Sequence, residues 1–141
     1  MAKIRISKHF NFEMAHALFD YDGPCKNIHG HSYELEVTLR GRIKESGFVI
    51  DFKELKAIVN KDIVNRLDHT LLLSKKSYEQ YPELAKLPYN QINVDFNPTC
   101  ENMLVYFVNS LKDKIPTDVE LVRVFLRETP TSYAEWFEED N

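Results

Sequence analysis

The sequence predicts an α+β domain in which two helices pack on one face of a four-stranded antiparallel sheet. Apolar residues alternate with polar ones towards both ends of the chain, as they do in half-buried strands. Two segments between them instead carry apolar residues at helical spacing. The expected order is therefore strand, strand, helix, helix, strand, strand, within a single domain covering residues 1–141.

The first two strands are expected at residues 3–17 and 31–41, where most alternate residues are apolar. A turn-forming cluster, Asp22-Gly23-Pro24, separates them, so they are expected to pair antiparallel. His16 falls on the apolar side of the first strand. The alternating apolar residues are Ile4, Ile6, Phe10, Phe12 and Met14, and then Tyr33, Leu35, Val37 and Leu39.

Each expected helix begins at a residue that can cap it. Asp51 precedes an apolar stripe that runs from Phe52 to Leu67, and Thr99 precedes a second stripe that ends before Pro116. Two final strands are expected at about 120–128 and 132–137.

Residues 74–97 have no sustained period and contain Pro82 and Pro88, so we expect a long connection or insertion there. A four-stranded sheet has two unpaired edges, which proteins usually cover or pair with another subunit. Oligomerisation is therefore expected.

Composition limits the classes of function. A net charge of -4 argues against a general nucleic-acid surface, although a basic pocket for a small anion can exist in an acidic protein. Charged residues interrupt the first ten positions, and no apolar stretch approaches membrane-spanning length, so we expect a cytoplasmic protein with no membrane partner. The two cysteines, Cys25 and Cys100, are expected to be thiols.

Three histidines form a candidate metal site. His29 and His31 are two residues apart at a strand entry and therefore point to the same side, and His16 ends the paired strand. Three neutral imidazoles with an open fourth position are a catalytic zinc arrangement, and nitrogen ligands favour zinc over magnesium or calcium. The alternative is a chance His-x-His pair beside an ordinary half-buried histidine.

Cys25 lies one short loop before His29. A nearby divalent cation would lower the pKa of its thiol and provide a base or nucleophile. It could equally be a small loop residue, or a fourth ligand that closes a structural zinc site. Spacing alone does not separate these three interpretations.

Each of four further acidic or imidazole side chains has an ordinary structural interpretation. Asp68 and His69 could form a proton relay or simply end a helix. Glu128 follows the apolar side of a strand, so it could bind a ligand donor or pair with Arg123 or Arg127. Glu101 is most simply a favourable charge at a helix start.

Six motifs, in this order, resemble the 6-pyruvoyl and 6-carboxy tetrahydropterin synthase family, and they span nearly the whole chain. They are FEMAH at 12–16, CKNIHGH at 25–31, GFVIDF at 47–52, LDH at 67–69, PTCEN at 98–102 and RET at 127–129. The chain departs from the family pattern at Met14, where a small residue is usual, and in the length of 74–97.

The resemblance implies roles for particular residues. The implied zinc ligands are His16, His29 and His31, and the implied catalytic residues are Cys25 as the base, His69 with Asp68 in proton relay, and Glu128 as the pterin anchor. Thr99 and Glu101 are expected to bind substrate with Glu128. The resemblance also implies a tunnelling fold, in which trimers close a barrel of strands and two trimers stack as a homohexamer with active sites at subunit interfaces.

The short spacing between Cys25 and His29 resembles the bacterial 6-carboxy branch of the queuosine pathway. The implied reaction converts 7,8-dihydroneopterin triphosphate to 6-carboxytetrahydropterin and releases acetaldehyde and triphosphate. The alternatives are the 6-pyruvoyl activity and a non-catalytic zinc- or pterin-binding module.

Overall fold

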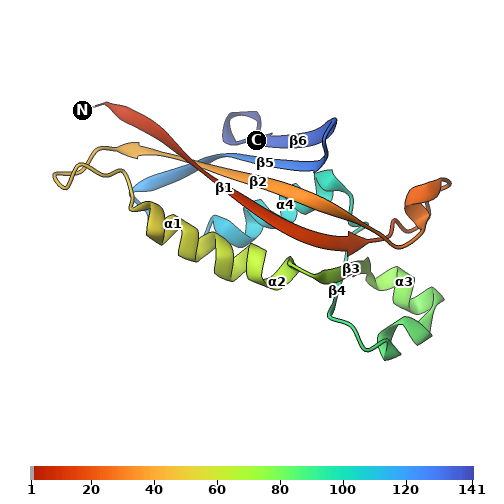
Figure 1. Ribbon diagram of the computed structural model, residues 1–141. Helices are drawn as coiled ribbons and strands as arrows, with labels where there is room; N and C mark the ends of the chain where they lie inside the picture. The colour runs from red at the N-terminus through yellow and green to blue at the C-terminus, as the bar shows by residue number, and fades with distance from the viewer. Residues whose placement is uncertain (1) are drawn as a thin grey trace.

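The computed structural model describes residues 2–141, so Met1 of the expected domain lies outside the described residues. Its centre is a six-stranded sheet with the order β4-β3-β1-β2-β5-β6 (Figure 1). The strands are β1 (Lys3–His16), β2 (His29–Arg42), β3 (Thr70–Ser74), β4 (Gln91–Val94), β5 (Val119–Thr129) and β6 (Ser132–Phe137).

The four strands expected from the alternating pattern are present and pair antiparallel. β1 pairs with β2 from Lys3↔Arg42 to His16↔His29, β2 pairs with β5, and β5 pairs with β6. From Phe10 to His16 of β1 and from Tyr33 to Gly41 of β2 the residues on one face are buried, and those between them are mostly exposed or half-buried. This alternation confirms the predicted hairpin.

The prediction of only four strands, all antiparallel, is wrong. β3 pairs parallel with the end of β1, and β4 pairs parallel with β3, which makes the sheet mixed. All five residues of β3 are buried, so its sequence shows no alternation, as is typical of a covered parallel strand. β4 has only four residues, which is too short for a period to show.

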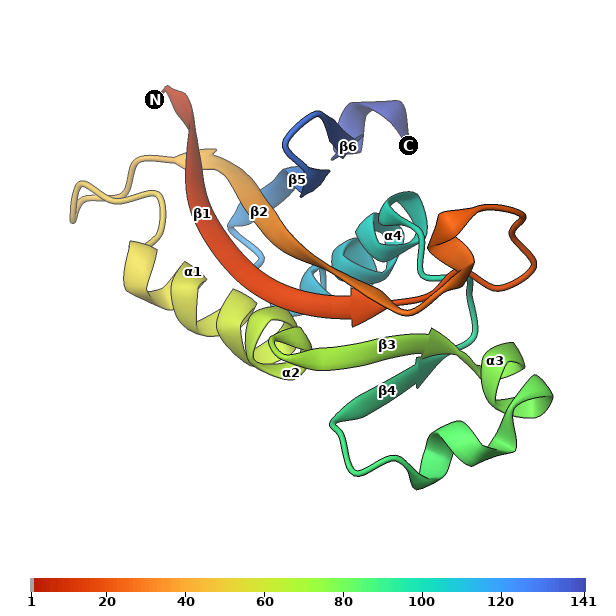
Figure 2. The same ribbon diagram turned by 45° about the vertical axis from the view of Figure 1, so that its right-hand side comes forward.

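The segment expected as a long connection therefore contains regular structure. After β3 come α3 (Lys75–Gln80), a 3-10 helix (Pro82–Lys86) and then β4. Figure 2 shows this segment as an extension beside the end of β1.

The two expected helices lie on one side of the sheet (Figure 1). The first is α1 (Phe52–Val59), which continues through a π-helical turn (Asn60–Val64) into α2 (Asn65–Leu67), and the second is α4 (Cys100–Leu111). The Asp51 side chain accepts a hydrogen bond from Lys53 N, and the Thr99 side chain accepts one from Asn102 N, so both predicted caps are confirmed. Short 3-10 helices at Pro24–Lys26 and Glu138–Asp140 complete the fold. Among residues 2–141, no helix is long and apolar enough to span a membrane.

The core lies between these helices and the sheet. Phe107 of α4 is fully buried, and its ring meets Phe12 of β1 edge-on at 6.2 Å between centroids. Large apolar residues from both expected helices and from β1, β2 and β5 form one cluster.

Phe107→Ala is expected to lower the free energy of unfolding by about 3–5 kcal/mol, because it removes buried area and leaves a cavity. Urea denaturation would measure the loss. The matched control is Val105→Ala on the same helix, whose side chain is exposed and whose loss should cost less than about 0.5 kcal/mol. Equal losses in the two variants would contradict the assigned core face of α4.

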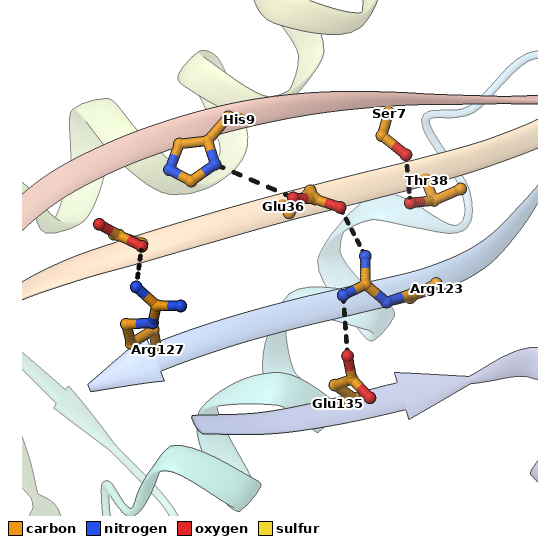
Figure 3. Close-up of polar contacts among 8 residues, drawn as sticks. Ser7, His9, Glu36, Thr38, Arg123, Arg127 and Glu135 are labelled. Carbon is orange, nitrogen blue, oxygen red and sulfur yellow. Dashed lines mark hydrogen bonds and ion pairs between the residues drawn. The ribbon is translucent and has the colours of Figure 1, made fainter. Parts of the chain in front are cut away.

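Ion pairs cross the strands on the face that the helices leave open (Figure 3). Arg123 of β5 contacts Glu36 of β2 at 2.6 Å and Glu135 of β6 at 2.8 Å, and Arg127 contacts Glu34 at 3.0 Å. Opposite charges on neighbouring strands stabilise the pairing register. These pairs therefore link the three strands β2, β5 and β6.

Candidate active site

Three imidazoles converge at the end of the β1–β2 hairpin. His16 is the last residue of β1 and pairs with His29, the first residue of β2, while His31 follows on the same side of β2. The ring centroids are 4.6 to 5.1 Å apart. One nitrogen from each ring lies within 4.8 Å of the others, so the predicted ligand set is brought together and could hold a metal ion.

The hydrogen bonds of the rings fix which nitrogen is free. His16 Nδ1 lies 2.8 Å from the Pro98 carbonyl oxygen and His29 Nδ1 lies 2.7 Å from the Asn27 carbonyl oxygen, so each Nδ1–H donates to the backbone. The two Nε2 atoms then lie only 3.1 Å apart, and His31 Nε2 is buried without a hydrogen-bond partner among the described residues. Metal-binding histidines commonly donate their second ring nitrogen in this way. The three nitrogens fit a shared cation.

The electrostatics also suit a metal. Burial lowers the pKa of His16 to about 4, and His29 and His31 contribute to the lowering. Burial and His29 lower the pKa of His31 as well. Neutral imidazoles are the form that binds a metal ion, and proton competition is therefore weak near neutral pH.

A cavity of about 200 Å³ lies beside the imidazoles and brings four predicted residues together. Cys25, Thr99, Glu101 and Glu128 all line it. The remaining walls come from His16, Leu18, Cys100, Ser132, Tyr133 and Ala134.

Cys25 enters this cavity from the 3-10 turn between β1 and β2. Its carbonyl oxygen accepts a hydrogen bond from Leu18 N at 2.8 Å, which ties the turn to the end of β1. Its sulfur does not belong to the group of converging ligand atoms, which contains only the three histidines among the described residues. The interpretation of Cys25 as a fourth ligand therefore has no support from this geometry.

Glu128 lies at the end of β5 with Oε1 3.5 Å from His31 Nε2. Burial and the nearby Glu101 raise the pKa of its carboxyl group. The alternative prediction, a salt bridge to Arg123 or Arg127, is wrong, because these arginines pair with Glu36, Glu135 and Glu34 on the other face of the sheet (Figure 3). Glu128 points to the helix side because it continues the alternation of the buried Val124 and Leu126.

Asp68 and His69 form a pair, but not in the cavity of Cys25. Asp68 Oδ2 lies 3.0 Å from His69 Nδ1, and its Oδ1 accepts the backbone N–H of Glu13, which lowers the pKa of Asp68. His69 has a left-handed φ of 58° and donates its N–H to the Glu13 carbonyl at 2.6 Å. Such strain in a residue other than glycine is often found at functional sites.

His69 instead lines a second cavity of about 500 Å³ with Glu13, Ser32 and Tyr89. The side chains of Glu13 and Ser32 alternate with those of the buried Met14 and of His31, so they belong to the opposite face of the hairpin, while Met14 and His31 also contribute to the wall of this cavity. No residue lines both cavities among those described. Within one chain, the structure thus separates His69 from Cys25.

Two residues of the site were not predicted from the sequence to belong to it. Cys100 lines the smaller cavity, and burial, Glu128 and Glu101 raise the pKa of its thiol to about 12. Tyr33 lies fully buried against the rings of His31 and His16. Its place two residues after His31 on the apolar side of the strand could have identified it.

The fold and the site define an α+β protein with a group of three histidines that could hold a metal ion, beside a small cavity. A family model described as 6-pyruvoyl tetrahydropterin synthase matches residues 5–139. The chain belongs to this family, which confirms the resemblance. It is 37% identical to 6-carboxy-5,6,7,8-tetrahydropterin synthase of Haemophilus influenzae, covering 95% of this chain and 99% of that protein.

A second relative has the same name, and a solved structure of the family has the same fold. The enzyme of the same name from Aquifex aeolicus is 34% identical, with 97% of this chain and 99% of that protein covered. The solved structure of Caenorhabditis elegans 6-pyruvoyl tetrahydropterin synthase has the same fold, with a TM-score of 0.71 at 24% identity over 97% of this chain and 96% of that one.

Proposed function

We propose that the chain is a zinc-dependent 6-carboxy-5,6,7,8-tetrahydropterin synthase that converts 7,8-dihydroneopterin triphosphate to 6-carboxytetrahydropterin, acetaldehyde and triphosphate. The observation that carries the proposal is the convergence of three imidazole nitrogens beside a cavity lined by Cys25 and Glu128. Relatives with this name, at 37% and 34% identity, favour it over the 6-pyruvoyl activity.

Zinc fits the site because all three donors are imidazole nitrogens and no fourth ligand atom converges with them among the described residues, as in a catalytic zinc site. When bound, it would act as a Lewis acid on the side-chain oxygens of the substrate and make the neighbouring C–H bonds more acidic. Cys25 would then take and return protons at those carbons. A thiol is suited to this step because its deprotonated form, the thiolate, is a good base and nucleophile.

The cavity residues would hold the pterin ring. The Glu128 carboxylate would accept hydrogen bonds from ring N–H groups and fix the ring relative to Cys25. Thr99 and Glu101, at the start of α4, line the same cavity and would complete the binding site. The proposed substrate is therefore a small pterin triphosphate rather than a nucleic acid or a membrane.

Asp68 and His69 would relay protons to the Cys25 of a neighbouring copy of the chain in the assembled protein. In one chain they lie on the opposite face from Cys25, so a neighbouring copy would have to bring them to it. β1 has no partner at residues 3–13 on its β3 side among those described, and β6 forms an edge of the sheet. These free edges support assembly through the strands. The proposed form is a single-domain chain that assembles as a homohexamer in the cytoplasm.

Incubation of the zinc-loaded protein with 7,8-dihydroneopterin triphosphate would test the activity. We expect acetaldehyde and 6-carboxytetrahydropterin, identified by mass spectrometry after derivatisation. A 6-pyruvoyl product without acetaldehyde would contradict the proposed branch, and an unchanged substrate would contradict catalysis.

Glu128→Gln is expected to weaken pterin binding by roughly 10- to 100-fold, because a hydrogen bond to a charged group contributes about 1.5–3 kcal/mol. Isothermal titration with the pterin neopterin would measure it. Glu54→Gln, which removes an exposed carboxylate from α1, is the matched control and should leave affinity unchanged. Unchanged neopterin affinity in the Glu128 variant would contradict the role of Glu128 as the pterin anchor.

A further inference from the structure

The hydroxyl group of Tyr33 is a buried donor without a protein partner. The side chain is 0% exposed, and its oxygen has no hydrogen-bond partner among the described residues. A buried polar group left unpaired costs roughly 1–3 kcal/mol, and such groups nearly always have a partner in native proteins. A group at this site is therefore expected to accept its hydrogen bond when the site is in use.

The ring of Tyr33 is held rigidly under the metal site. It stacks on Phe12 with centroids 5.0 Å apart and an interplanar angle of 10°. It meets the rings of His31 and His16 edge-on at 5.5 and 6.2 Å. Because the ring is packed on these sides, its hydroxyl has a fixed position.

Two cavity residues lie near that hydroxyl. The strand register brings Glu128 beside Tyr33, because their neighbours Arg127 and Glu34 are paired, and Glu128 Oε1 lies 3.5 Å from His31 Nε2, whose ring contacts that of Tyr33. Burial is the main cause that raises the pKa of Tyr33, and Glu128 and Cys100 raise it further. The Cys100 thiol already donates to the Leu126 carbonyl oxygen at 3.4 Å, and sulfur is a weak acceptor. The Glu128 carboxylate is the stronger acceptor of the two.

A bound metal changes the surroundings of Glu128. Its Oε1 now lies 3.5 Å from His31 Nε2, the nitrogen that is free to bind a metal. That nitrogen can donate a proton to a carboxylate or give its lone pair to a metal, but it cannot do both. Once a metal occupies the site, Glu128 either becomes a metal ligand or finds another donor.

We infer that Tyr33 is that donor and acts as a positioning residue. Its hydroxyl holds the Glu128 carboxylate, directly or through one water, so that the carboxylate stays out of the open metal position and faces the cavity. The inference deepens the proposed function and rests on it for the role of Glu128 in pterin binding. The contact between Tyr33 and Glu128 in the metal-loaded protein can be tested without that function.

The primary test uses the visible spectrum of the Co²⁺-loaded protein, in which an additional carboxylate ligand raises the coordination number and weakens the absorption bands. Tyr33→Phe keeps the ring and is expected to weaken these bands. Glu128→Gln and the double variant should both retain the spectrum of the unmodified protein. Tyr106→Phe, which removes another hydroxyl from the same core, is the matched control.

A Tyr33→Phe spectrum identical to that of the unmodified protein would overturn the inference. It would also be overturned if the change in Tyr33→Phe persisted in the double variant, because the effect would then not pass through Glu128.

A second readout is neopterin binding to the zinc-loaded protein. Tyr33→Phe should weaken it about tenfold in the presence of Glu128 and less than about twofold in the Glu128→Gln variant, as expected for coupled residues. Equal weakening in both backgrounds would contradict the positioning role. If the unmodified protein bound no neopterin, the proposed function would fail, and the cobalt spectra would still decide the role of Tyr33.

Discussion

His29→Ala is expected to release the metal and to lower turnover by at least roughly a thousandfold. The variant removes one of three nitrogens that meet within 4.8 Å, and two imidazoles hold zinc poorly. Lewis-acid catalysis contributes several kcal/mol, and each 1.4 kcal/mol or so corresponds to a factor of ten in rate. Elemental analysis of the purified variant, together with its steady-state rate, would measure both effects.

His9→Ala is the matched control for this variant. His9 lies on β1 as His16 does, but its side chain is 47% exposed and approaches Glu36 on the open face of the sheet (Figure 3). Its loss should leave one metal per chain and a normal rate. If His29→Ala kept its metal, the proposed ligand set would be wrong.

Cys25→Ala is expected to keep the metal and yet lower turnover by about 10²- to 10⁴-fold, the usual contribution of a general acid–base group. The sulfur lies outside the group of converging nitrogens, so its removal should not disturb them. Metal content and turnover, measured on the same preparation, separate the two roles that the sequence left open.

Lys26→Ala changes the neighbouring residue in the same turn and serves as the control for local disturbance. We expect a change in rate of less than about threefold. Loss of zinc from Cys25→Ala would indicate that Cys25 is a structural ligand. A normal turnover rate in that variant would show that Cys25 has no role in proton transfer.

The parts of the fold that the sequence predicted are those with a visible period. The β1–β2 hairpin and the two expected helices each have one buried and one more exposed side. The apolar residues of the buried side therefore recur at strand or helix spacing in the sequence. β3 is buried at every position and β4 is short, so neither shows a period. The parallel pairing of β3 with β1 depends on contacts between distant segments, which local patterns do not contain.

In the candidate site too, some features follow from local sequence patterns and others depend on contacts between distant segments. The convergence of His16, His29 and His31 follows from strand alternation and hairpin register, both of which the sequence indicates. The separation of His69 from Cys25 depends on how the start of β3 pairs with the end of β1, and no spacing along the chain encodes that pairing. The unpaired hydroxyl of Tyr33 likewise became evident only when the packing around it was known.

X-ray absorption at the zinc edge of the purified protein tests the central claim most directly. We predict three imidazole nitrogens at about 2.0–2.1 Å together with one exchangeable oxygen ligand. A sulfur scatterer at about 2.3 Å would show that Cys25 is bonded to the ion and would contradict the proposed chemistry.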